Sequence, residues 1–227
     1  MRSPGVTVRY LGKDKLNRLL KLIILFLTLA IGAECCAFDW PVSPEAVREA
    51  YFFGQSSDRA TVAKFLGQYI RDPQPQDRSS FAGRIELHTP YQRVVERSSE
   101  STANYSAQQA QIDYAAQSDI VGVRVFVYLP AGGPAPSDIF SDSRGHILDR
   151  RENFWREFQF RITQEHVIEP KKILGQPLYS RRGRGLSGAQ VDLELDASEI
   201  SSGELMIQVM SPDHRIVTAH FDLDRLK

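Results

Sequence analysis

Hydrophobic side chains occupy every second position through much of the C-terminal half of the chain. In residues 120–129 four valines alternate with polar and aromatic side chains, and the same alternation recurs at 191–196, 205–210 and 217–223. Side chains on a β-strand point alternately to opposite faces, so a period of two predicts strands with one buried face. Turn-forming residues separate these segments, which favours an antiparallel arrangement.

Shorter segments of the same kind predict further strands. Ile85 and Leu87 alternate with Glu86 and His88, and residues 91–96 are expected to continue as a second strand. Apolar positions at 158–162 and 173–179 predict two more, of which the second is broken at Pro177.

A different period precedes these strands. Ser43-Pro44-Glu45 has the composition of a helix start, and Gly54 is a typical stop. Apolar residues then recur three and four positions apart up to Ile70, before Pro73. Residues 44–71 are therefore predicted to form a two-helix hairpin, and 72–80 a polar linker. Around residues 98–118 the sequence favours either a helix, from about 103 to 117, or a mobile insertion.

These patterns predict an α+β fold, in which an N-terminal helical hairpin packs on an antiparallel β-sandwich. The expected organisation is an N-terminal signal or anchor helix over 1–37, the hairpin and linker over 38–80, and the sandwich over 81–227. The strand rhythm is similar to that of Ig-like exported domains, and a resemblance of this kind implies no activity.

The first 37 residues have the layout of an export signal. Six basic residues and one acidic residue lie at or before Lys21, and the run from Leu22 to Ala33 carries no charge. Twelve apolar residues are fewer than the ~20 that a spanning helix needs, which favours a cleaved signal peptide over a retained membrane anchor. Cleavage is expected after Ala33 or Ala37. Lipid attachment at Cys35 or Cys36 is a third interpretation.

Composition narrows the class of protein. The 227 residues carry 28 basic and 28 acidic side chains, and 42% of them are hydrophobic, as in ordinary globular proteins. Without residues 1–37 the net charge becomes −4, which argues against a nucleic-acid partner. Two cysteines exclude a disulfide-dense scaffold and a four-cysteine zinc site. No cofactor is predicted.

Candidate chemistry is sparse. The carboxylates of Asp192, Glu194 and Asp196 share one strand face and are a candidate for binding Ca²⁺. A glycine-rich loop contains the candidate anion-binding residues Arg181, Arg182 and Arg184.

Two histidines and one aromatic pair are expected to have structural roles only. His88 and His220 lie on the polar faces of predicted strands, where surface or cross-strand roles are expected. Phe154 and Trp155 are expected to fill the core rather than to line a sugar site.

The sequence therefore favours a non-catalytic binding or structural module, exported to the periplasm, the cell envelope or the medium. Its expected partner is a protein or a glycan of the envelope, and it meets a membrane only through the N-terminal segment. Two alternatives stay open. One is an exported hydrolase whose site assembles only in the fold, and the other is a membrane-anchored envelope component.

Overall fold

The protein is described by a computed structural model that covers residues 38, 40–73, 81–101, 105–129, 153–179 and 186–227. These residues belong to one compact unit, Cys36–Lys227. The unit combines α-helices with antiparallel sheets, so the predicted α+β class is confirmed. The leader at 1–37, most of the linker at 74–80 and the loop with Arg181, Arg182 and Arg184 lie outside the described residues.

The described chain contains four α-helices, two 3₁₀ helices and nine strands. In chain order these are α2 (Pro44–Gly54), α3 (Arg59–Gly67), β1 (Ile70–Arg71), β2 (Ala82–His88), α4 (Pro90–Glu100), α5 (Ala107–Ala115), β3 (Ile120–Tyr128), η1 (Phe154–Glu157), β4 (Gln159–Thr163), β5 (Val167–Ile168), β6 (Lys172–Tyr179), β7 (Leu186–Asp196), η2 (Ala197–Glu199), β8 (Glu204–Met210) and β9 (Ile216–Asp222).

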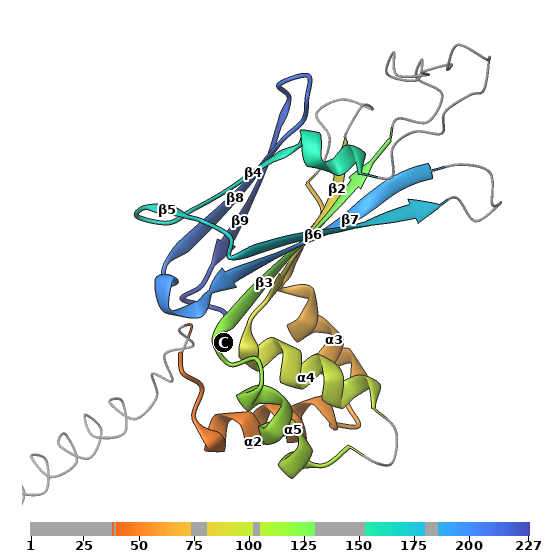
Figure 1. Cartoon of the computed structure of the whole chain (residues 1–227). Helices are drawn as coiled ribbons and strands as arrows, with labels where there is room; N and C mark the ends of the chain where they lie inside the picture. The colour runs from red at the N-terminus through yellow and green to blue at the C-terminus, as the bar shows by residue number, and fades with distance from the viewer. Residues whose placement is uncertain (1–37, 39, 74–80, 102–104, 130–152, 180–185) are drawn as a thin grey trace, which may run out of the picture. The chain divides into compact units, whose positions relative to one another are not determined.

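The strands form two antiparallel sheets (Figure 1). One sheet has the order β1-β2-β3-β7-β6 and the other the order β5-β4-β8-β9. Their inward residues, among them Val125, Leu193, Ile207 and Phe221, belong to one buried cluster. The alternating positions of the sequence thus line this core, and their polar neighbours point outward.

The helices form a second cluster at one end of the five-stranded sheet (Figure 1). Val47 and Ala50 of α2 pack with Val62 of α3, Val95 of α4 and Ala110 of α5. Phe65 contacts both this cluster and the sheet core, and so links the two. Among the described helices, none is both long and apolar enough to cross a membrane.

Three local predictions are wrong. Residues 91–96 are helical, because Thr89 caps α4 through its Oγ1 and Pro90 occupies the first turn. The second predicted helix ends at Gly67, since Ile70 and Arg71 pair with β2. Strand β6 runs unbroken through Pro177, which an edge strand tolerates because one of its edges needs no N–H donor.

Trp155 is a core residue, as predicted. Its side chain is buried in the sheet cluster, and its ring lies directly against Gly175 of β6.

Candidate functional site

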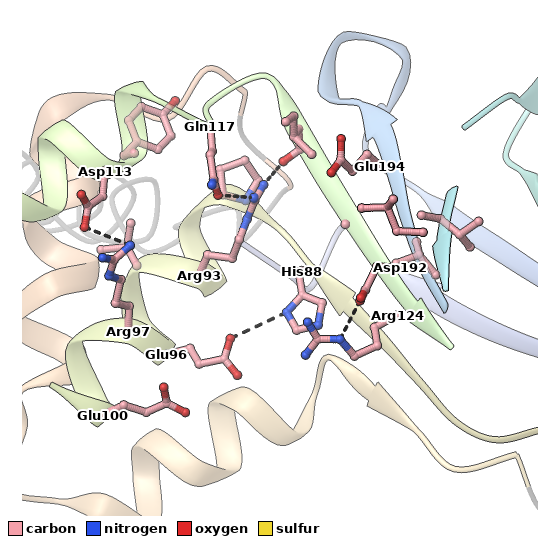
Figure 2. Close-up of a pocket in the computed structure, with 18 of the residues that line it drawn as sticks. His88, Arg93, Glu96, Arg97, Glu100, Asp113, Gln117, Arg124, Asp192 and Glu194 are labelled. Atoms are coloured by element: carbon pink, nitrogen blue, oxygen red, sulfur yellow. Dashed lines mark hydrogen bonds and ion pairs between the residues drawn. The ribbon is translucent and has the colours of Figure 1, made fainter. Parts of the chain in front are cut away.

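A pocket of about 700 Å³ lies between helices α4 and α5 and the outward face of the five-stranded sheet (Figure 2). Its volume is in the range typical of small-molecule sites. The residues that line it are His88, Pro90, Arg93, Val94, Glu96, Arg97, Glu100, Tyr105, Asp113, Tyr114, Gln117, Ile120, Gly122, Val123, Arg124, Leu174, Asp192, Leu193 and Glu194.

The helical wall follows from the period of α4. Tyr91, Val95 and Ser98 are buried at helical spacing. Arg93, Glu96, Arg97 and Glu100 recur on a different stripe and line the pocket. Because α4 begins two residues after β2 ends, this charged stripe lies beside the end of the sheet.

Two rows of paired residues cross the sheet at the pocket, and all of them except Glu86 line it. In one row Glu86 of β2 lies opposite Arg124 of β3, which lies opposite Asp192 of β7. In the next row His88 lies opposite Gly122, which lies opposite Glu194. Gly122 has no side chain, so the second row has a gap between its histidine and its glutamate.

Arg124 holds the first row together. Its Nε donates to Asp192 Oδ1 at 2.7 Å, and its Nη1 lies 3.7 Å from Glu86 Oε2. Gln190 donates to the second oxygen of Asp192 at 2.8 Å. The charge of Arg124 is thus compensated by carboxylates from both neighbouring strands.

His88 bridges the sheet and helix α4. Its Nε2 lies 3.4 Å from Glu86 Oε2 and its Nδ1 lies 3.7 Å from Glu96 Oε2, while only 13% of the side chain is exposed. Burial lowers the pKa of His88, but the two carboxylates together outweigh burial and raise that pKa above 6.5. The interaction with His88 in turn lowers the pKa of Glu96. The ring faces outward, as the strand pattern predicts, but α4 covers it.

Arg93 differs from the other arginines of the pocket because its hydrogen bonds go to neutral acceptors and not to a carboxylate. Its Nη1 donates to Gln117 Oε1 at 3.0 Å and its Nη2 donates to the carbonyl of Ile120 (Figure 2). Both acceptors are neutral, and the buried Nε has no hydrogen-bond partner. Burial lowers the pKa of Arg93, against the weaker attraction of Glu194 and Asp119.

Arg97 closes the side of the pocket near α5. Its Nη1 lies 3.1 Å from Asp113 Oδ2, and its guanidinium lies 5.4 Å from the centre of the Tyr105 ring. Its side chain is 61% exposed, so this ion pair stabilises the fold little.

The candidate calcium ligands do not gather into one site. Asp192 pairs with Arg124, Glu194 Oε1 lies 3.5 Å from Lys172 Nζ, and Asp196 Oδ2 lies 2.8 Å from Lys171 Nζ. Hydrogen bonds from Lys171 and Ser198 lower the pKa of Asp196 to about 2. In the part of the chain that the structure describes, no group of three His, Cys, Asp or Glu side chains converges to hold a metal ion.

Asp192 and Glu194, which the sequence offered only as calcium candidates, line the pocket, where they pair with Arg124 and Lys172. His220 has the expected cross-strand role, with Nδ1 2.8 Å from Glu204 Oε1. Sequence reasoning missed the charged residues of α4, because 91–96 was assigned to a strand. The signal that identifies them is Thr89-Pro90 followed by Tyr91, Val94, Val95 and Ser98 at helical spacing.

The chain matches no protein-family model, no curated protein sequence and no solved structure.

Proposed function

We propose that this protein is an exported, non-catalytic binding module of the cell envelope or periplasm, and that the pocket beside α4 is its binding site. The observation that carries the proposal is the pocket itself, which has a rigid sheet as its floor and charged side chains aimed into it. Ligand sites are typically concave and have a few convergent polar groups placed by rigid elements.

The leader and the strand rhythm supply the remaining parts of the proposal. The basic and then apolar residues of 1–37 support a signal or anchor helix. The two antiparallel sheets with a shared core support an Ig-like sandwich as the scaffold. Its partner is a protein or a glycan of the envelope.

Blocking the pocket tests whether it is the binding site. A Cβ at Gly122 would lie 3.4 Å from Cβ of His88, an ordinary contact, so the backbone accepts a side chain here and Gly122→Leu places its further carbons on the pocket side of the sheet, beside His88. Saturation-transfer NMR with N-acetylglucosamine oligomers and short peptides as probes measures binding. We expect the wild type to bind one or more of these probes and Gly122→Leu to bind none of them. Gly67→Ala is the control and should bind the same probes as the wild type, because an added Cβ at Gly67 meets no atom within 4 Å.

Equal binding by wild type and Gly122→Leu would refute the pocket as the site. Failure of the wild type to bind any probe would count against a glycan or peptide ligand.

An exported hydrolase is the second candidate function, and His88 is the observation that favours it. The imidazole lies in the pocket beside Glu96, and a histidine next to a carboxylate is a common general base. Among the described residues that line the pocket none is Ser, Thr or Cys, so such an enzyme would activate water. Hydrolysis of ester or glycoside chromogens by the wild type, lost in His88→Gln, would favour the enzyme over the binding module.

The fate of the leader separates a free module from a membrane-anchored envelope component. Mass measurement of the exported protein should show the loss of residues 1–33 or 1–37. A full-length species in the membrane fraction would favour the anchored alternative, and a full-length species in the cytosol would contradict export.

A further inference from the structure

Ion pairs account for most of the charges in the pocket. Arg124 pairs with Asp192 and Arg97 pairs with Asp113. Glu96 pairs with His88, and Glu194 pairs with Lys172. A ligand that approaches these groups meets charges that are already compensated, so they contribute little to the preference for one ligand charge over another.

Arg93 differs because its two hydrogen bonds go to an amide oxygen and a peptide carbonyl. A guanidinium has five N–H donors, so three of the five have no partner among the described residues. The Nε–H is closed to solvent. One N–H on each Nη is therefore not engaged by any described residue.

The position of this guanidinium makes an anion favourable. A half-buried positive charge without a carboxylate partner is costly, and an incoming carboxylate offsets that cost with two charge-assisted hydrogen bonds. Glu194 and Asp119 attract Arg93 only from beyond ion-pair distance. Neither therefore occupies the place that a ligand carboxylate would take.

The rest of the lining limits the anion to a small organic acid. Five carboxylates border the same cavity, on Glu96, Glu100, Asp113, Asp192 and Glu194. Four of the five already have ion-pair partners, but Glu100 has no ion pair among the described residues and repels a multiply charged anion such as phosphate more strongly than a monoanion. Val94, Ile120 and Leu174, together with two tyrosines, provide apolar surface for an uncharged body.

We infer that the ligand of this pocket is a small molecule or chain end with a single carboxylate, and that Arg93 binds the carboxylate. The inference rests on the proposed binding function and adds the chemical class of the ligand. A free carboxyl group occurs both on small acids and at peptide C-termini, and the two sources present the same chemistry to Arg93.

The test compares an acid with its neutral amide. N-acetylphenylalanine and N-acetylphenylalanine amide are titrated into the purified protein, with binding measured by calorimetry or NMR shifts. Hydrogen bonds to charged groups contribute about 1.5–3 kcal/mol, so the acid should bind about 10- to 150-fold more tightly than the amide. A tripeptide with a free C-terminus, tested beside its amidated form, distinguishes a chain end from a free acid as the source. Inorganic phosphate should not displace the acid.

Variants assign the preference to Arg93. Arg93→Gln should abolish the difference between acid and amide, and Arg93→Lys should keep part of it because the charge remains. Arg225→Gln is the matched control, since Arg225 is 85% exposed and pairs with Asp222 outside the pocket. If Arg93→Gln does not fold, the acid preference of the wild type still tests the carboxylate, and its reduction in Arg93→Lys assigns that preference to Arg93.

The outcomes separate this inference from the proposed function. Equal binding of acid and amide, both lost in Gly122→Leu, would overturn the carboxylate inference and leave the binding site intact. Acid binding that survives Arg93→Gln would also overturn it. Failure of both probes on a protein that binds glycans at the pocket would overturn the inference alone.

Discussion

Replacing Gly54 by alanine would bring a methyl group against helix α4, where the last residue of α2 crosses it. An ideal Cβ at Gly54 would lie 2.7 Å from Cβ of Ser98, and closer still to the carbonyl oxygen of Val95. The oxygen belongs to the helix backbone and cannot rotate away, so the two helices must separate. Overpacking of this kind costs about 1–3 kcal/mol. Removing a glycine from the unfolded chain offsets about 0.4–1 kcal/mol of that cost.

We therefore expect Gly54→Ala to lower the free energy of unfolding by about 1.3 kcal/mol, within a range of about 0–2.6 kcal/mol. Gly67 is the matched control, because it ends α3 as Gly54 ends α2, and an added Cβ there meets no atom within 4 Å. Gly67→Ala should be neutral or stabilise by up to about 1 kcal/mol. Urea denaturation of both variants measures the difference. A Gly54→Ala midpoint equal to or above that of Gly67→Ala would refute the close approach of α2 and α4.

Two other changes test the sheet and the pocket. Gly175→Ala should destabilise the protein by about 1–3 kcal/mol, because the new methyl group would overlap the buried Trp155 ring; unchanged thermal unfolding would contradict the packing of that ring. The pKa of His88 is raised in the folded state by Glu86 and Glu96, so its contribution to stability is complete below about pH 6.5 and is lost as pH rises through the higher folded-state pKa. The stability difference between wild type and His88→Gln should therefore shrink over that window in urea titrations, and a constant or growing difference would refute the assignment.

The sheets were predictable because burial on one face leaves a direct record in the sequence. Alternation identified β3, β7, β8 and β9, since every second position faces the core and is apolar, although some outward positions such as Phe126 and Met206 are apolar too. Sequence patterns predicted the wrong secondary structure where contacts with distant segments determine it. Ile70 continues a helical stripe of apolar residues in the sequence, yet it pairs with β2, as does Arg71. Thr89-Pro90 carried a helix signal that the preceding strand pattern obscured.

The pocket could not be predicted, because its parts come from segments whose register the sequence does not state. Arg124 meets Asp192 only because β3 pairs with β7 in the observed register, 68 residues away along the chain. Arg93 differs from the other arginines of the pocket because no carboxylate of a described residue lies within ion-pair distance of it. Its sequence neighbours do not show this, because the nearby groups come from α5, β3 and β7. The strand pattern likewise predicts that His88 is a surface residue, whereas in the structure α4 covers its side chain.

Gly122 connects the stability of this fold to its proposed function. Glycine in a strand interior costs roughly 0.5–1 kcal/mol relative to alanine, because it restricts the unfolded chain less and packs no side chain. At Gly54 and Gly175 a close neighbour explains the glycine, whereas a Cβ at Gly122 would meet only ordinary contacts with His88. Packing therefore does not require glycine at this position. Gly122 lines the pocket between His88 and Glu194 and adds no side chain to it, and Arg93 lines the same pocket from α4. Gly122 therefore costs strand stability but leaves space in the pocket, and this supports the pocket as the proposed binding site.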